Sequence, residues 1–335
     1  MISTSSSPRV LVPARLRTDL GEARGEVLVL RGACMGTSWE VRVAGLARER
    51  ATRLHAEIAT ILETLEAQMS HFRAESDLSR FAGLAAGEVL QLPVEFAHVL
   101  RTALDVAQRS GGAFDPTLAG AIAAWGFGPG MKFSEEGFLL PEQAPGGSAW
   151  HLLHVDENNR ICQPGGVALN LAAIAKGFAV DAVAGYLTQL GYDNHLVEVG
   201  GELRGSGMKP DAQPWWVALE LPAAECPLAV TRVALHGLAV ATSGSYRRHY
   251  HAEGRDLQHT LDPRTGAPVR HAMASVTVVH EECMLADAWA TAIMVLGPQD
   301  GLALAQRQGL AALLQWRAGG QWCEAGSEAW KEMEQ

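Results

Sequence analysis

The sequence predicts a folded protein that mixes helices with strands, arranged as one large domain or as two packed lobes. Its 335 residues are 48% hydrophobic and 19% charged, a composition that supplies a sizeable core and argues against wholesale disorder. Segments that alternate apolar and polar residues, typical of strands, stand beside segments with apolar residues at helical spacing. We find no internal repeat in this pattern.

The charge balance and the cysteines narrow the functional classes. A formal net charge of −10 argues against a general nucleic-acid binder, although helix N-termini or a metal still allow an acidic protein to hold phosphate. No C-x-x-C pair is present, so we expect neither a zinc ribbon nor a redox motif. The cysteines are predicted to be scattered structural thiols in a reducing compartment: Cys34, Cys162, Cys226, Cys283 and Cys323.

Residues 1–25 are rich in Ser and then mix Arg with Asp and Glu. They lack the apolar run of a secretory signal, and no later stretch of about 20 apolar residues could span a membrane. We therefore expect a mobile N-terminal leader at 1–25, no membrane span and a cytoplasmic location.

The first third of the chain predicts a hairpin and two helices. Residues 27–43 alternate apolar and polar residues around Met35-Gly36, which indicates a hairpin. Residues 47–67 and 93–110 carry apolar residues at helical spacing. Phe72, between these helices, either joins the core, which its spacing favours, or forms an aromatic plate for a planar ligand.

A Gly-rich break containing Asp115-Pro116-Thr117 follows the second helix. Asp115 and Thr117 either cap the next helix or present a carboxylate and a carbonyl to a ligand. Residues 128–148, rich in Gly and Pro, are expected to form a variable excursion, and residues 149–169 to contain short strands.

A helix is expected from Asn170 to about residue 189, with Asn170 as its N-cap and Gly191 beyond its C-terminal end. Its N-terminus follows glycines and can hold an anion. The alternative is structural: Asn170 only caps, Lys176 is solvated and Gly177 allows close packing.

The second half of the chain predicts strands at 194–203, 215–221, 230–238 and 275–280, with a sharp polar turn at 242–247. A helix is expected at 283–296, where Asp287 and Thr291 are spaced i, i+4 and share a face. This pair suits a hard cation such as Mg²⁺. Alternatively, Asp287 favours the helix dipole and Thr291 bonds back to a carbonyl.

Residues 259–269 combine an ionisable His259 with Asp262, Arg264, two hydroxyls, two prolines and a glycine. Pro263 fixes its own φ and Gly266 permits a turn, so a stiff polar loop that holds reactive groups is expected. A plain surface turn is the alternative, since Asp-Pro and Thr-Gly are ordinary turn chemistry.

The order of these motifs carries a family resemblance between about residues 32 and 297. The motifs are Met-Gly-Thr, Met-Ser-x-Phe with Ser-x-x-Ser-Arg-Phe, Gly-x-Phe-Asp-Pro-Thr with Trp-Gly-Phe-Gly, Ile-Ala-Lys-Gly-x-Ala-Val-Asp, Val-Gly-Gly-Glu, Thr-Ser-Gly-x-Tyr, His-x-x-Asp-Pro-Arg-Thr-Gly-x-Pro and Ala-Asp-Ala-x-Ala-Thr. Together they resemble the ApbE family, the FAD:protein FMN transferases.

The resemblance implies an α+β fold of two lobes, with mixed or antiparallel sheets flanked by helices and FAD between the lobes. It implies a single domain over residues 26–335. The implied activity is Mg²⁺-dependent transfer of FMN from FAD to a Ser or Thr hydroxyl of an acceptor flavoprotein, with release of AMP. Neither nucleic acid nor a membrane span is expected.

The resemblance also assigns roles to individual residues. The implied FAD contacts are Met35, Phe72, Ala113, Phe114, Asp115, Asn170, Lys176 and Leu261. The implied Mg²⁺ ligands are the carbonyl of Ala173 with Asp287 and Thr291, and His259 is the implied general base. Asn170 stands where the family usually has Asp, and Phe72 where Tyr is common.

The implied chemistry agrees with the residue types. An alcohol must attack a pyrophosphate phosphorus, so a cation has to offset the developing charge and a base has to take the hydroxyl proton. Two alternatives are an FAD-binding carrier or assembly protein without transfer and a metal-dependent FAD pyrophosphatase. The presence of His259, Asp287 and Thr291 favours catalysis over binding alone.

Overall fold

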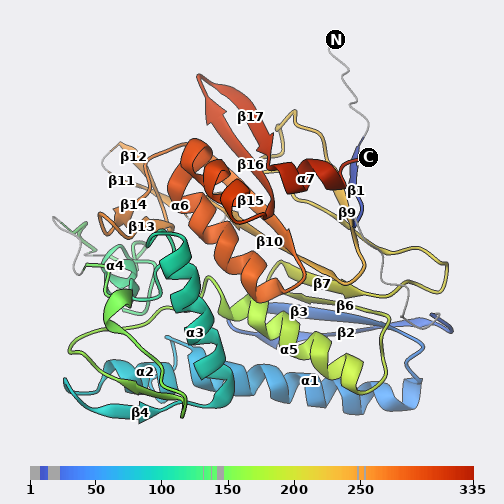
Figure 1. The fold of residues 1–335 in the computed structure, drawn as a ribbon, viewed down its shortest axis with the longest axis horizontal. Helices are drawn as coiled ribbons and strands as arrows, with labels where there is room; N and C mark the ends of the chain where they lie inside the picture. The colour runs from blue at the N-terminus through green and yellow to red at the C-terminus, as the bar shows by residue number, and fades with distance from the viewer. Residues whose placement is uncertain are drawn as a thin grey trace.

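An eight-stranded antiparallel sheet organises the fold (Figure 1). The computed structural model describes residues 8–13, 23–130, 132–136, 138–141, 147–246, 249–252 and 254–335. In the sheet, the strands lie in the order β17-β16-β15-β10-β7-β6-β3-β2. Their bounds are β2 Val27–Cys34, β3 Thr37–Ala44, β6 His195–Val199, β7 Glu202–Ser206, β10 Leu238–Gly244, β15 Met273–His280, β16 Ala311–Ala318 and β17 Gln321–Gly326.

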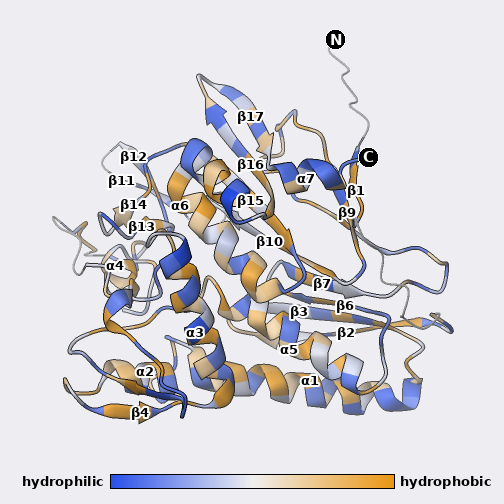
Figure 2. Ribbon diagram, viewed as in Figure 1, coloured by the Kyte–Doolittle hydropathy of each residue, from blue (hydrophilic) through white to orange (hydrophobic). Residues whose placement is uncertain are grey.

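Helices cover one face of this sheet and form the larger core. Side chains alternate across a strand, so Val197 and Val199 of β6 face the helices whereas Leu196 faces the other way. The helices are α1 Arg48–Met69, α3 Val94–Arg109, α5 Ala175–Gln189 and α6 Cys283–Arg307. Figure 2 shows apolar and polar residues mixed along α1, as expected of a helix with one buried side.

A second, three-stranded sheet packs against the other face. Its order is β1-β9-β8, with β1 Arg9–Leu11, β8 Trp215–Ala218 and β9 Thr231–Leu235. Together with α7, Glu328–Met333, it encloses a separate apolar cluster that includes Leu11 and Trp330, both fully buried.

Strand β1 lies within the region expected to be a leader. It pairs in parallel with β9, and its buried Leu11 ties it to the core, so residues 9–11 belong to the folded part. Most of the expected leader, residues 1–7 and 14–22, lies outside the described residues.

Smaller elements surround the helical side of the main sheet. They are α2 Asp77–Ala82, β4 Val89–Gln91, α4 Ala119–Ala124, the 3₁₀ turn η1 Trp150–Leu152, β5 Arg160–Cys162, β11 His249–Ala252, β12 Arg255–Gln258, β13 Leu261–Asp262 and β14 Ala267–Pro268. No helix in the described part of the chain is long and apolar enough to cross a membrane.

The structure confirms the α+β class, the hairpin at 27–43 and the helices expected at 47–67 and 93–110. The helix expected at 283–296 is the first segment of α6, which kinks at Gly297, where φ is 80°, before continuing to Arg307. The five cysteines are free thiols, of which Cys162 is exposed.

Local secondary-structure predictions are wrong at Asn170 and at residues 242–244. Asn170 does not cap α5, because its side chain accepts a hydrogen bond from Ala172 N in a turn and the helix begins only at Ala175. Thr242–Gly244 do not form the predicted turn. They continue β10 and pair with β15, because this pairing gives their backbone groups hydrogen-bond partners, and the chain turns only after Gly244. The end of the predicted turn, residue 247, lies outside the described residues.

Replacing Gly177 with Ala should destabilise the protein by about 1–3 kcal/mol through overpacking. The reason is that a Cβ at this position would lie 2.4 Å from the carbonyl oxygen of Cys283. Gly185 is the matched control in the same helix, because a Cβ there meets no atom within 4 Å. Gly185→Ala should stabilise by about 1 kcal/mol through helix propensity. Urea unfolding measures both changes, and equal effects would contradict the close approach.

Candidate active site

The start of α5 packs directly against the first turns of α6, and this contact fixes the position of Asp287. Gly177 provides the close approach, and its backbone N–H donates a hydrogen bond to Asp287 Oδ2 at 3.2 Å. Asp287 is 5% exposed. Burial raises the pKa of this carboxyl, while the nearby Lys176 and the Gly177 hydrogen bond oppose the rise.

A second carboxylate of α5 holds the N-terminus of α6. Cys283 N donates to Asp181 Oδ1 at 3.0 Å and Met284 N donates to Oδ2 at 2.8 Å. These two backbone N–H groups belong to the first turn of α6, where N–H groups have no acceptor within the helix itself. The preceding residue, Glu282, gives no side-chain cap. Arg204 of β7 forms an ion pair with the same carboxylate. Asp181 therefore joins α5, α6 and the main sheet.

Lys176 interacts with two buried carboxylates. Its Nζ is 2.5 Å from Glu202 Oε1, and the charge of Asp287 also acts on it. Burial alone would lower the pKa of Lys176, but the two carboxylates outweigh this effect and raise it, so the ammonium stays charged. Glu202 is 4% exposed, and this burial raises the pKa of its carboxyl group.

The donor groups near Asp287 fit a hard cation. Thr291 lies one turn along the same face of α6, with its hydroxyl 3.1 Å from Ser243 Oγ of β10. Ala173 lies in the turn that leads into α5, so its carbonyl belongs to the segment packed beside Asp287. Carboxylate, hydroxyl and carbonyl oxygens are the ligand types that Mg²⁺ accepts. Within the described ranges, no group of three or more His, Cys, Asp and Glu forms an alternative metal site.

The loop of Asp115 packs beside the segment of Asn170. Asp115 Oδ1 accepts hydrogen bonds from the backbone and hydroxyl of Thr117, at 2.7 and 2.6 Å. Its other oxygen, Oδ2, is buried without a partner among the described residues. Asn170 N donates to Pro116 O at 2.7 Å, which joins the two segments. Ala113 and Phe114 are buried in the core, so any ligand contact from them falls to the backbone.

His259 and Leu261 lie against the α4 region. Leu261 is buried in a cluster with Leu118 and Trp125, and Trp125 Nε1 donates to Gly266 O at 2.8 Å. The ring of Phe127 meets the ring of His259 edge-on, with 6.2 Å between centroids. These contacts hold the loop that was predicted from residues 259–269.

Within that loop, Asp262 and Arg264 are structural partners. Arg264 Nε and Nη2 bind the two carboxylate oxygens of Asp262 at 2.9 and 2.8 Å. Burial acts to raise the pKa of Asp262, but these hydrogen bonds keep the pKa below its ordinary value. Gly266 takes φ 64° and donates to Asp262 O, closing the β13–β14 hairpin.

Met35 and Phe72 lie at the C-terminal end of α1. Met35 N donates to Glu66 Oε2 at 2.9 Å, and Arg73 Nε donates to Glu66 Oε1 at 3.2 Å. The core position that spacing favoured for Phe72 is wrong, because this side chain is 60% exposed. Its ring, the alternative aromatic plate, is therefore accessible for stacking.

Contacts link these segments into one region. A Cβ on Gly200 would lie 2.9 Å from Thr37 and 3.4 Å from Lys176, so the β6–β7 turn joins the β2–β3 turn to α5. Asn170 and Ala173 share the segment that enters α5. Glu202 and Asp181 belong to the motifs Val-Gly-Gly-Glu and Ile-Ala-Lys-Gly-x-Ala-Val-Asp, for which the sequence predicts no role at these two positions. In the sequence, Glu202 directly follows two glycines at the end of a predicted strand, and this position was the available indication that Glu202 belongs to the site.

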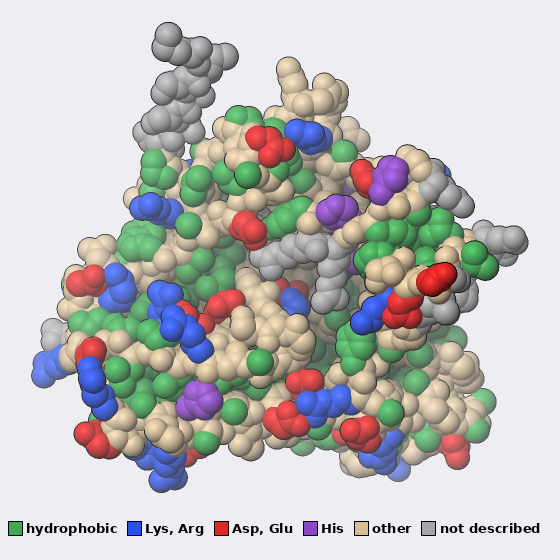
Figure 3. Space-filling model, turned by 180° about the vertical axis from the view of Figure 1, so that it is seen from behind, with side chains coloured by type: hydrophobic (Ala, Val, Ile, Leu, Met, Phe, Trp, Pro, Cys, Tyr) green, Lys and Arg blue, Asp and Glu red, His purple; other side chains and the backbone are tan. Residues whose placement is uncertain are grey.

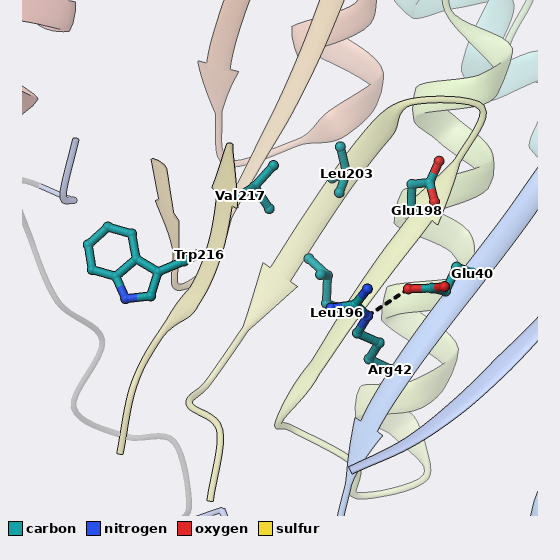
Figure 4. A pocket seen from close by; sticks show the side chains of 7 residues that line it. All are labelled: Glu40, Arg42, Leu196, Glu198, Leu203, Trp216 and Val217. Atoms are coloured by element: carbon teal, nitrogen blue, oxygen red, sulfur yellow. Dashed lines mark hydrogen bonds and ion pairs between the residues drawn. The ribbon is translucent and has the colours of Figure 1, made fainter. Parts of the chain in front are cut away.

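A separate hollow lies on the opposite face of the main sheet. It measures about 190 Å³ and is lined by Glu40, Arg42, Leu196, Glu198, Leu203, Trp216 and Val217 (Figure 4). None of the predicted site residues lines it. On the face seen from behind in Figure 3, acidic and basic side chains are interspersed.

The chain is similar to known proteins along most of its length. The sequence pattern of the ApbE family matches residues 35–314. The FAD:protein FMN transferase of Haemophilus influenzae is 33% identical over 319 residues, 92% of this chain and 92% of that protein. The FAD:protein FMN transferase of Escherichia coli K12 is 31% identical over 299 residues, 86% of this chain and 84% of that protein.

Solved structures agree with the sequence comparison. The flavinyl transferase ApbE of Pseudomonas stutzeri, in its apo form, superposes with a TM-score of 0.82 at 36% identity, covering 92% of this chain and 96% of that one. The flavin transferase ApbE of Vibrio cholerae gives a TM-score of 0.81 at 30% identity, covering 92% of this chain and 100% of that one.

Asp181→Ala should lower the free energy of unfolding by about 2–3 kcal/mol, because two helix N-terminal amides lose a charged acceptor. Amide exchange at Cys283 and Met284 should rise more than elsewhere in α6. Asp105→Ala is the control, because its ion pair with Arg109 spans 3.1 Å between half-exposed side chains. Such a pair contributes at most about 0.5 kcal/mol. Unchanged amide exchange in the Asp181 variant would contradict the capping role.

Proposed function

The chain belongs to the ApbE family, and on this premise we propose that it transfers FMN from FAD to a protein hydroxyl. The acceptor is a Ser or Thr of a target flavoprotein, AMP is released and Mg²⁺ is required. The observation that carries the proposal is the α5–α6 contact, which gathers Lys176, Asp287 and Thr291 at one place. Curated relatives with the name FAD:protein FMN transferase support it.

In the proposed reaction, His259 takes the proton of the acceptor hydroxyl as its oxygen attacks the FMN phosphorus of FAD. A new phosphoester bond to FMN forms, the pyrophosphate bond breaks and AMP leaves with the electron pair. The neutral imidazole suits this task because His titrates near neutral pH. The edge-on contact with Phe127 and the buried Leu261 support a fixed position for His259.

The remaining groups bind and orient FAD. Asp287, Thr291 and the carbonyl of Ala173 would hold Mg²⁺, which when bound offsets negative charge on the pyrophosphate oxygens. Lys176 adds a fixed positive charge beside this place. FAD would lie between the two proposed lobes, with the exposed ring of Phe72 stacking on one of its flat rings.

One assay separates the proposal from its alternatives. The protein is incubated with FAD, Mg²⁺ and a candidate acceptor flavoprotein, and mass spectrometry and nucleotide analysis follow covalent flavin and AMP. We expect both products in equal amounts. AMP and FMN without an adduct would indicate a pyrophosphatase, and bound FAD with neither product would indicate a carrier.

His259→Ala should reduce FMN transfer by a factor of at least about 100, the lower range for a general base. Binding of FAD, measured by flavin fluorescence, should remain, because the variant removes only the proposed proton acceptor. His154→Ala, an exposed residue outside the site, is the control. Transfer at the wild-type rate in the His259 variant would refute this assignment.

Asp287→Asn should lose most of the Mg²⁺ response, because an amide keeps the size of the side chain but removes the charge that attracts the cation. Calorimetric titration of the protein with Mg²⁺ checks this result independently of activity. Asp105→Asn is the control on an exposed helix surface. Equal Mg²⁺ affinity in wild type and the Asp287 variant would exclude Asp287 as a ligand.

A further inference from the structure

Glu202 is a buried charge that the proposed reaction does not yet use. The residue is 4% exposed, its Oε1 is 2.5 Å from Lys176 Nζ, and its Oε2 is buried without a hydrogen-bond partner among the described residues. Removing a carboxylate from water is costly, and a salt bridge in such a place rarely repays the cost through stability alone. A functional role at this position is therefore expected.

The backbone aims this carboxylate at Lys176. Glu202 begins β7 directly after the Gly200-Gly201 turn and pairs with Val199 of β6. Gly200 has φ 62° and donates its N–H to Ser38 O at 3.0 Å, which fixes the turn beside the β2–β3 hairpin. The turn can approach Lys176 closely because Gly200 has no side chain.

We propose that Glu202 is a positioning residue for FMN transfer, holding the ammonium of Lys176 in place to neutralise the pyrophosphate of FAD. This inference rests on the proposed function and deepens it. Lys176 itself is the group that faces the substrate, and Glu202 acts through it.

The arrangement of charges explains why a second carboxylate is needed. Lys176 is attracted by both Asp287 and Glu202. A cation bound by Asp287 would cancel that attraction, and only Glu202 would then hold the ammonium group. A pre-positioned charge stabilises the transition state more than the bound substrate, since charge on the phosphoryl oxygens changes as the bond breaks.

The same hairpin supplies a matched control. Glu198 of β6 also supports the turn, because its Oε1 accepts a hydrogen bond from Gly201 N at 3.1 Å. Its side chain lies on the opposite face of the sheet and lines the hollow of Figure 4. Glu198→Gln therefore removes a carboxylate charge from the same hairpin without altering the charge beside Lys176.

The test measures steady-state FMN transfer by wild type, Glu202→Gln, Lys176→Met, the double variant and Glu198→Gln, each at saturating Mg²⁺. Glu202→Gln should lower kcat at least tenfold while KM for FAD changes less than threefold. Because Glu202 acts through Lys176, the double variant should be no slower than Lys176→Met alone. Glu198→Gln should retain the wild-type kcat.

Any one of three outcomes would overturn the inference. These are a wild-type kcat in Glu202→Gln, independent losses that multiply in the double variant, or an equal loss in Glu198→Gln. Circular dichroism and thermal unfolding confirm folding. If Glu202→Gln does not fold, Glu202→Asp replaces it, which keeps the charge one methylene short and should lower kcat without changing KM. Absence of transfer by the wild type would instead refute the proposed function.

Discussion

The close approach of α5 and α6 is the contact on which the rest of this structure depends. It requires a residue without a side chain at Gly177, whose N–H then reaches Asp287. One turn further along α5, Asp181 accepts hydrogen bonds from the first amides of α6. Hydrogen bonds from backbone amides thus set the positions of the Asp287 and Asp181 carboxylates and join the start of α6 to α5.

This contact also creates an electrostatic problem that the fold resolves with one lysine. Two carboxylates, Asp287 and Glu202, are buried near each other, and burial raises the pKa of both. Lys176 interacts with both and compensates for one negative charge. The remaining negative charge makes this place attractive to a cation, and a cation with a lysine makes it attractive to a pyrophosphate. The proposed binding site and the packing of the core therefore depend on the same charges.

The loop of residues 259–269 is held by a different set of contacts. Its hairpin is closed by Gly266 and by the Asp262–Arg264 pair, and it is anchored to α4 by Trp125 and Leu261. None of these contacts involves α5. The two parts of the proposed site thus come from separate structural units, and strand β10 of the main sheet places Ser243 beside Thr291 of α6.

The sequence by itself determined the helices at 47–67 and 93–110, the β2–β3 hairpin, the Asp287–Thr291 spacing and the turn at Gly266, because these depend on local periodicity and on Gly. Its local rules failed at Asn170, whose side chain accepts a hydrogen bond from Ala172 N in a turn before the helix begins, and at Phe72, whose exposure no spacing reveals. The ion pair between Glu202 and Lys176 joins residues 26 positions apart, and the hydrogen bond from Gly177 to Asp287 joins residues 110 positions apart. Only the tertiary structure decided these, because burial and charge at a point are set by every segment that packs there.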